Sequence, residues 1–188
     1  MGASLVMETV KKKPNLLLCA ATGSSPEGLY KELATLAHVE LEPFKQLRIL
    51  KLDEWAGIPE SHPVSCEYFL KKKLLGPLDI AQERYISFAS DPNEPAPKLE
   101  PFCHVAALSA ESLKHPMIAS LDQKPEYGLT LGLKEILDSR LIIMLVSGKE
   151  KKHVAEKFLE GSVSTELPAS FLWQHPQVEC LVDQTVLD

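Results

Sequence analysis

The length, composition and charge of the chain exclude several classes of protein. Its 188 residues are 45% hydrophobic and 24% charged, which suits a folded protein and excludes disordered or collagen-like chains. The formal net charge of -6 argues against a broad nucleic-acid-binding surface, although a local anion pocket remains compatible with it. We therefore expect a single domain over residues 1–188 and no nucleic-acid partner.

The sequence predicts neither a membrane span nor a metal centre. Its longest apolar runs fall short of the roughly 18–20 residues that cross a bilayer, and its first residues lack a secretory signal. The cysteines form no CxxC pair, and the histidines lack metal-ligand spacing. We expect a cytoplasmic protein with buried thiols, no metal and no membrane partner.

Short apolar runs alternate with helical patterns along the chain. Residues 15–21, 47–52 and 141–146 are almost continuously hydrophobic, which is typical of strands buried on both faces of a parallel sheet. Residues 178–182 are a weaker candidate. Apolar residues recur at helical spacing after the first run and after the third. This alternation predicts an α/β sandwich.

Two segments stand apart from the alternation. Residues 91–101 contain four prolines in DPNEPAPKLEP and form either a linker or an active-site loop, because proline fixes φ and removes backbone donors. Residues 1–13 resemble the rear half of an amphipathic helix that leads into the first strand. We therefore expect a preceding strand and half-helix in the parent molecule.

The motif ATGSSP at residues 21–26 lies between a predicted strand and a predicted helix. Gly23 allows close backbone approach, and Ser24 and Ser25 supply hydroxyl groups. The helix start directs N–H groups and the positive end of its dipole at the loop. The motif predicts a phosphate-binding loop, with an ordinary N-capped turn as the alternative.

Two carboxylates follow the second apolar run, in the motif KLDEW. In open α/β sheets ligands bind beyond the carboxyl ends of strands, so Asp53 and Glu54 fall on the same edge as Gly23. One of them is a candidate base, and a solvated acidic turn is the alternative. Neighbours in an extended segment point to opposite sides, so only one can face the pocket.

Several lysines follow the third apolar run, in SGKEKKH at residues 147–153. Cations at a helix N-terminus oppose the helix dipole unless an anion offsets them. Lys149, Lys151 or Lys152 is therefore a candidate to reach a phosphate. A solvated basic face is the alternative.

Six motifs, taken in order, resemble the glucosamine-6-phosphate deaminase and galactosamine-6-phosphate isomerase family. They are ATGSSP, KLDEWAGIPESHPVSCEYFL, NEP, YGLTLGLKEIL, LVSGKEK and STELPASFLWQHP, and they span nearly the whole chain. KLDEW and the last motif look more like the galactosamine-type members. The related 6-phosphogluconolactonases typically continue with Arg where Trp55 stands. The resemblance implies a three-layer α/β sandwich with a mostly parallel, Rossmann-like sheet.

The resemblance also implies site residues. Asp53 matches the proton-shuttling carboxylate, and Glu94 belongs to the catalytic relay that opens the sugar ring. The positions that match phosphate-binding residues are Thr22, Gly23, Ser24, Ser25 and Lys151. His104 stands where many glucosamine-type members have a phosphate-binding Arg, and is a candidate substrate contact. Neither a cofactor nor a metal is implied.

The middle of the chain departs from the family pattern. The family has Gly-x-Gly-x-Asp or Asn-Gly-His, then three residues, then Asn-Glu-Pro. Here Glu94 and its neighbours follow ISFASDP, and Ala89 replaces the ring-opening histidine. A true deletion of a central strand would destabilise the fold, because the neighbouring strands would lose their ladder hydrogen bonds. We therefore expect the chain to omit segments of a longer molecule, with a spatial break at residues 90–93.

The function expected of the parent molecule is aldose-ketose isomerisation of a 6-phospho-2-amino sugar, with loss of ammonia. Asp53 would move a proton from C2 to C1 through a cis-enol intermediate. A noncatalytic sugar-phosphate sensor and a 6-phosphogluconolactonase-like hydrolase are the alternatives. The expected partner is a small sugar phosphate, and a homo-oligomer is left open.

Overall fold

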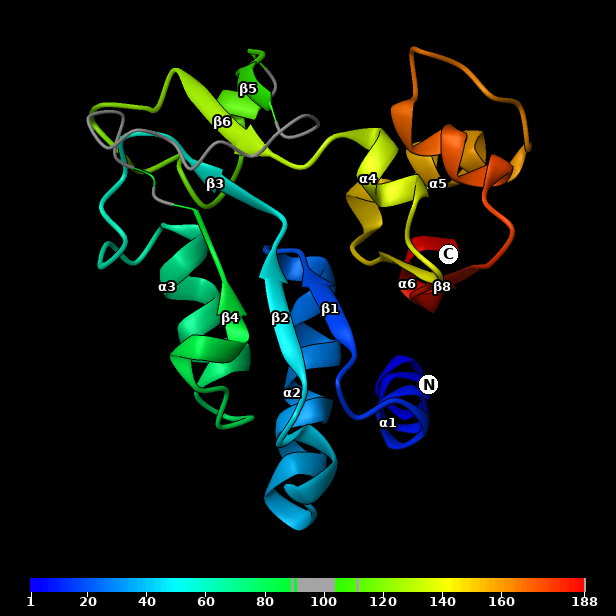
Figure 1. Cartoon of the computed structure of the whole chain (residues 1–188). Coiled ribbons are helices and arrows are strands. Elements are labelled where there is room, and N and C mark those ends of the chain that lie inside the picture. The colour runs from blue at the N-terminus through cyan, green and yellow to red at the C-terminus, as the bar shows by residue number, and fades with distance from the viewer. Residues whose placement is uncertain (89, 91–103, 111, 188) are drawn as a thin grey trace. The chain divides into compact units, whose positions relative to one another are not determined.

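The computed structural model describes residues 1–88, 90, 104–110 and 112–187 (Figure 1). Its internal contacts divide the chain into two compact units, Met1–Gly132 and Leu133–Asp188. Each unit combines helices with strands. The single domain over residues 1–188 stays a prediction, and the expected break at residues 90–93 falls largely outside the described residues.

The first unit contains a parallel and an antiparallel sheet. Its elements are α1 (Gly2–Lys12), β1 (Leu17–Ala20), α2 (Ser24–Val39), η1 (Glu42–Phe44), β2 (Arg48–Lys51), β3 (Asp53–Trp55), α3 (Cys66–Leu70), η2 (Lys71–Leu75, a π-helical turn), η3 (Gln82–Arg84), β4 (Tyr85–Ile86), β5 (His104–Ala107), η4 (Ser112–Lys114) and β6 (Tyr127–Thr130). The parallel sheet has the order β1-β2-β4, and the antiparallel sheet has the order β3-β6-β5 (Figure 1).

The helices of the first unit bury the apolar stripes that their sequences predict. The buried residues of α1 are Ala3, Val6, Met7 and Val10, and those of α2 are Pro26, Tyr30, Leu33 and Ala37. Their spacing of three and four residues puts each set on one side of its helix. The helix predicted within residues 1–13 is therefore confirmed.

The parallel sheet of the first unit is buried on one face. The strand register places five residues on that face, namely Leu18, Ala20, Ile49, Lys51 and Tyr85, and all but the half-buried Leu18 are buried. The opposite face carries Leu17, Cys19, Arg48, Leu50 and Ile86, and only Leu50 among them is half-buried rather than exposed. The strand positions are confirmed, but burial on both faces is wrong for β1, because the described part of this unit supplies one apolar layer.

The second unit is built on a parallel pair of strands. Its elements are α4 (Leu133–Leu137), β7 (Ile142–Val146), η5 (Lys149–Lys151), α5 (Lys152–Leu159), η6 (Pro168–Gln174), β8 (Val178–Val182) and α6 (Gln184–Leu187). β7 pairs with β8 in parallel, from Ile142 opposite Val178 onward. The rings of Phe158 and Trp173 stack with centroids 5.5 Å apart, and the Trp173 indole N–H donates to the Phe158 carbonyl.

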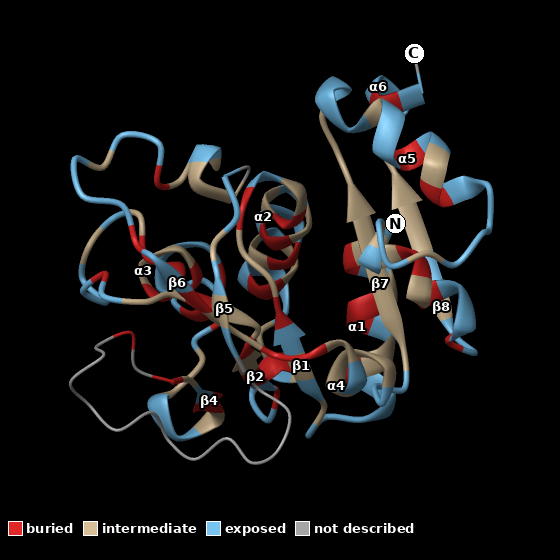
Figure 2. Cartoon of the chain, turned by 90° about the horizontal axis from the view of Figure 1, so that it is seen from above, coloured by how far each residue is buried: buried red, intermediate tan, exposed pale blue. Residues whose placement is uncertain are grey.

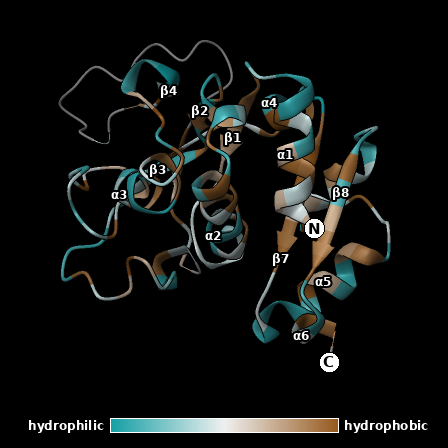
Figure 3. Cartoon of the chain, turned by 90° about the horizontal axis from the view of Figure 1, so that it is seen from below, coloured by the Kyte–Doolittle hydropathy of each residue, from teal (hydrophilic) through white to brown (hydrophobic). Residues whose placement is uncertain are grey.

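The strand β7 is hydrophobic throughout and yet only half-buried. Figure 3 colours the ribbon of β7 as hydrophobic, and Figure 2 shows intermediate burial along its length. Its described sheet has two strands, so one backbone edge of β7 has no strand partner among the described residues. The α/β class with mostly parallel strand pairing is confirmed, whereas complete burial of this strand is not.

Cysteine burial differs from the prediction. Cys66 is buried, but Cys19 is exposed and Cys180 is half-buried, and all three are thiols. Cys103 lies outside the described residues. Among the helices that the structure describes, none is long and apolar enough to cross a membrane.

The one-sided burial of the parallel sheet predicts unequal effects of two similar substitutions. Ile49→Ala removes a fully buried side chain and should lower the free energy of unfolding by about 2–5 kcal/mol. Leu17→Ala acts on a side chain with 40% exposure and should cost less than about 1 kcal/mol. Urea denaturation measures both. Equal losses would contradict the one-sided core.

Candidate functional site

The chain changes sheets at Leu52, immediately before the candidate base. The N–H of Leu52 donates to the carbonyl of Ala20, at the end of β1, at 3.2 Å. Its carbonyl accepts from the N–H of Leu131, just after β6, at 3.0 Å. β2 ends at Lys51 and β3 begins at Asp53, so Asp53 lies at the carboxyl end of the parallel sheet, the edge where α/β proteins bind ligands.

The loop between β1 and α2 has the geometry expected of ATGSSP. Gly23 precedes α2 as its N-cap with φ of 102°, a backbone conformation that side chains disfavour. The hydroxyl of the buried Tyr30 donates to the carbonyl of Ala21 at 2.7 Å and so ties the loop to the second turn of α2. Strand, glycine turn and helix start therefore follow in the order that was predicted.

The Asp53 carboxylate contacts this loop through Thr22. The Thr22 hydroxyl forms a hydrogen bond with Asp53 and lies 3.2 Å from the Cys66 thiol. Burial, and then the charge of Glu54, raise the pKa of Asp53 to about 6, while Lys51 and the Thr22 hydrogen bond oppose the rise. Its Oδ1 is buried and has no hydrogen-bond partner among the described residues. An unpaired carboxylate oxygen with this pKa is suited to accept a proton near neutral pH.

The adjacent carboxylate, Glu54, has both of its oxygens engaged in hydrogen bonds within the protein. It accepts from three backbone N–H groups, those of Trp55 at 2.8 Å, Cys66 at 2.9 Å and Glu67 at 2.8 Å. Its Oε2 also lies 3.1 Å from Lys51 Nζ. Two of these N–H groups belong to the first turn of α3, where a negative charge is favoured by the helix dipole. Glu54 therefore caps α3, and Asp53 is the better candidate for the base.

The indole of Trp55 is a functional candidate that the sequence did not single out. Asp53 and Trp55 are two residues apart on β3, and so their side chains leave the same face of the strand. Trp55 Nε1 is buried and has no hydrogen-bond partner within the part of the chain that the structure describes. The Trp55 ring lies 5.6 Å from the ring of His115. One face of β3 thus carries an unpaired acceptor and an unpaired donor, the groups that a polar ligand would satisfy.

Cys66 is not a candidate nucleophile despite its place beside Thr22. Burial, followed by the charges of Asp53 and Glu54, raises the pKa of its thiol well above the ordinary value. The thiol is therefore protonated at neutral pH, and only the thiolate is strongly nucleophilic. Its contribution here is a polar contact to the Thr22 hydroxyl.

The other predicted site residues are distributed as follows. Ser24 is exposed and Ser25 is half-buried at the start of α2. Lys151 is exposed at the end of η5, in the second unit. The backbone of His104 pairs with Thr130, which also pairs with Asp53, so the three backbones share one row of the antiparallel sheet. Glu94 lies outside the described residues.

The described residues contain no group of three or more His, Cys, Asp or Glu side chains that could hold a metal ion. The chemistry that their geometry supports is proton transfer by a buried carboxylate next to a glycine turn at the start of a helix. Both parts of that site come from the first unit.

Comparisons with known proteins identify relatives over almost the full length of the chain. An Escherichia coli (strain K12) protein named "Putative deaminase AgaI" is 32% identical over 216 residues, which cover 97% of this chain and 86% of that protein. A glucosamine-6-phosphate deaminase of Bacillus velezensis is 30% identical and covers 97% of this chain and 91% of its own length. The chain belongs to the glucosamine-6-phosphate deaminase family. No family model matches it.

A solved structure of this family has the same fold. The structure of a monomeric glucosamine-6-phosphate deaminase, described as a missing link of the NagB superfamily, superposes with a TM-score of 0.85. It is 27% identical, and the match covers 98% of this chain and 92% of that one. The family resemblance seen in the motifs is therefore confirmed across both units.

The stretch aligned with the E. coli protein is longer than this chain. The match to the E. coli protein extends over 216 residues, more than the 188 residues of this chain. Some positions of the relative therefore have no counterpart within this chain. This agrees with the expectation that the chain lacks segments that its relatives contain.

The neighbouring carboxylates should affect stability in opposite directions. Asp53 has a pKa of about 6 in the folded protein against an ordinary value of 3.8, so the folded state keeps its proton where the unfolded chain has lost it. Ionising Asp53 thus costs stability increasingly from about pH 4 to pH 6, and the cost is complete above that range. Asp53→Asn, which cannot ionise, should gain up to about 3 kcal/mol at pH 7–8 and nothing below about pH 4.

Glu54→Gln is the matched control for this prediction. It replaces one acceptor oxygen with an NH₂ donor among N–H groups and Lys51, so it should lose about 1–3 kcal/mol at pH 7. Thermal and urea unfolding across pH 4–8 measure both variants. Destabilisation of Asp53→Asn at pH 7 would contradict the proposed state of Asp53.

Proposed function

We propose that this chain, as part of its complete molecule, catalyses aldose-ketose isomerisation of a 6-phospho-2-amino sugar with hydrolytic loss of ammonia. The observation that carries the proposal is the buried Asp53 oxygen, without a hydrogen-bond partner among the described residues, at the carboxyl end of the parallel sheet beside the Thr22–Gly23 loop. The named activities of the relatives support it. The substrate is glucosamine 6-phosphate or galactosamine 6-phosphate.

The substrate phosphate is proposed to bind at the start of α2. The first N–H groups of a helix have no intrahelical partner, and the positive φ of Gly23 lets the backbone approach an anion. Thr22, Ser24 and Ser25 add hydroxyl groups, and Lys151 is proposed to supply a positive charge. Binding energy from this remote group would orient C1 and C2 against Asp53.

The proposed proton transfer uses Asp53 alone among the described carboxylates. Asp53 removes the proton from C2, the electrons of the C2–H bond form the C1–C2 double bond, and the C1=O electron pair moves to O1, which takes a proton from solvent to give the cis-enol intermediate. The same carboxyl group returns the C2 proton to C1 while the amino nitrogen forms a double bond to C2 and loses a proton to solvent, which leaves an imine at C2. Water adds to that imine and ammonia leaves, giving a 6-phospho ketose. Glu94 is proposed to assist opening of the sugar ring.

A sugar-phosphate sensor without catalysis is the second candidate. The observation that favours it is Ala89 in the position of the family's ring-opening histidine. Such a sensor would bind the sugar phosphate but would not exchange its C2 proton. The cytoplasmic location and the homo-oligomer that the sequence left open stay predictions.

Asp53→Asn should abolish most of the proton exchange at C2. The substitution keeps the shape of the side chain and removes its basic oxygen, so exchange with solvent should fall by about 10²–10⁴-fold. In the wild type, exchange should also decline as the pH drops below about 6, because Asp53 becomes protonated. Deuterium incorporation into both amino-sugar phosphates, followed by NMR, measures the step. Binding without exchange by the wild type would favour the sensor.

Lys151→Ala and Gly23→Ala should act on binding of the phosphate. A phosphate contact exists in both the ground state and the transition state, so Lys151→Ala should raise KM more than it lowers kcat.

Gly23→Ala strains a backbone with φ of 102° and should weaken binding of inorganic phosphate, although no atom lies within 4 Å of the added Cβ. Gly161→Ala, at φ of 76° in the second unit, is the matched control and should bind phosphate normally. Equal phosphate affinities in both glycine variants would place the phosphate elsewhere.

A further inference from the structure

Lys51 is a fully buried cation two residues before the proposed base. Its Nζ lies 3.1 Å from Glu54 Oε2 and 3.0 Å from Glu67 Oε2, and these side chains have exposures of 0%, 0% and 2%. The ammonium also lies 4.9 Å from the centre of the buried Phe88 ring. A buried charge is stable only when it is paired and hydrogen-bonded, and both carboxylates satisfy that requirement.

Glu67 extends this arrangement toward β4. The hydroxyl of the buried Tyr85 donates to Glu67 Oε2 at 2.8 Å, and Lys71 Nζ lies 3.1 Å from Glu67 Oε1. Burial raises the pKa of Glu67, but the charge of Lys51 and the hydrogen bonds outweigh it, so the pKa lies below its ordinary value. We call Lys51, Glu54, Glu67 and Tyr85 the Lys51 cluster. Its side chains form salt bridges and hydrogen bonds that join β2, β3, α3 and β4.

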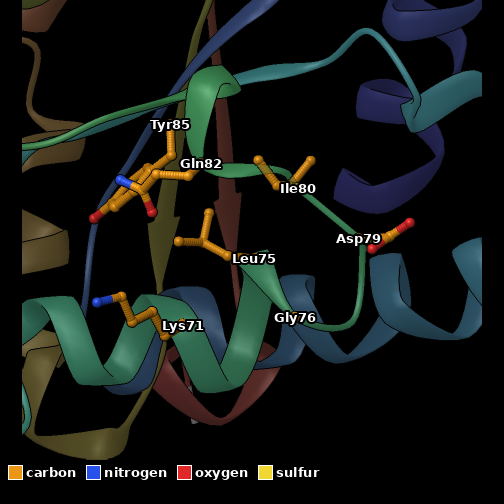
Figure 4. Close-up of a pocket in the computed structure, with 7 residues that line it drawn as sticks. All are labelled: Lys71, Leu75, Gly76, Asp79, Ile80, Gln82 and Tyr85. Carbon is orange, nitrogen blue, oxygen red and sulfur yellow. The ribbon is translucent and has the colours of Figure 1, made fainter.

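The outer end of the cluster meets an open hollow of about 300 Å³. Figure 4 shows the side chains of Lys71 and Tyr85 along this hollow, where Lys71 comes from the π-helical turn after α3. Lys71 has 49% exposure, whereas Lys51 has none. The two lysines therefore bind the same Glu67 carboxylate, Lys51 from the protein interior and Lys71 from the solvent-exposed side.

The Lys51 cluster fixes the residues on both sides of Asp53. Lys51 and Glu54 converge on the start of α3, and Leu52 is hydrogen-bonded to the chain after both β1 and β6. The side chains of Lys51 and Glu54 reach α3, whereas that of Asp53 contacts Thr22. Movement of the cluster would turn β3 and displace the Asp53 carboxylate.

We propose that the Lys51 cluster is the positioning device of Asp53, holding its carboxylate toward the Gly23 loop and supplying the cation that keeps it ionised for proton transfer. The catalytic part of this inference rests on the proposed function. Lys51 acts through Asp53 and does not touch the substrate.

Several groups face Asp53 from the elements around it. Thr22 lies in the loop after β1, Tyr30 is on α2, Cys66 is on α3, and Lys51 and Glu54 are its near neighbours in the chain. The thiol and the phenol are neutral, because burial is the largest cause that raises the pKa of each. Among the described residues, the charge of Lys51 favours the Asp53 carboxylate and the charge of Glu54 opposes it.

The test compares Lys51→Met with Glu54→Gln in the full chain. Losing the cation should raise the titration midpoint of Asp53 by about one pH unit, and losing the anion should lower it. Two readouts report the midpoint: the acid limb of C2 proton exchange, and ¹³C NMR of protein labelled at aspartate. The Asp53 resonance is assigned by its loss in Asp53→Asn. For each protein, the exchange rate at pH 6 is divided by the plateau rate of the same protein at high pH. This ratio should be several-fold lower for Lys51→Met than for the wild type.

Lys71→Met is the matched control, because it removes a lysine from the other oxygen of Glu67 at a solvent-exposed position. Its Asp53 midpoint should stay near the wild-type value, since solvent screens its charge. If Lys51→Met fails to fold, Lys51→Met/Glu67→Gln removes the cation and one of its buried partners together, and the same rise is expected.

A purely structural role for Lys51 predicts a different result. Partial unfolding would lower the exchange rate by the same factor at every pH and leave the titration midpoint of Asp53 unchanged. Unshifted midpoints in folded Lys51→Met or the double variant would overturn the inference. If the wild type shows no exchange with either sugar phosphate, the proposed function is wrong. The NMR midpoints then decide on their own whether the cluster controls Asp53.

Discussion

A lysine without contact with water, at the end of β2, constrains everything around the candidate site. Its charge needs two carboxylates, and those carboxylates must come from the next strand and from α3. Glu54 in turn needs the first N–H groups of α3, so the helix must begin where it does. The position of Asp53 is a by-product of these requirements. A low-dielectric ion pair thereby specifies a geometry, even where an apolar replacement would give comparable stability.

The sequence predicted the parts of the site that depend on local order. A glycine between a strand and a helix, and carboxylates after a strand, are features of contiguous residues, and the structure has them as expected. Alternation along an extended segment also separated Asp53 from Glu54 correctly. The sequence did not reveal that Lys51 reaches Glu67, sixteen positions away, because that contact depends on how α3 packs. Nor did it reveal that residues 53–55 pair with β6 in a separate antiparallel sheet.

The predicted strands illustrate the limit of composition as a guide to burial. A run such as LIIMLV predicts a strand from its β-branched and aliphatic residues, and β7 is one. Whether both faces are covered depends on neighbours elsewhere in the chain, and these are lacking for β1 and β7 among the described residues. The family relatives extend over more positions than this chain contains, which is consistent with a smaller set of neighbours.

The exposed face of the parallel sheet favours association between copies of the chain at high protein concentration. Leu17, Cys19 and Ile86 are exposed on this face and Leu50 is half-buried, next to an edge of β1 whose ladder groups are not used by a described strand. Such surfaces template sheet stacking between copies and lead to aggregates. Arg48 is the single charge in this row of five. Its exposed positive charge opposes the stacking of this face against a second copy.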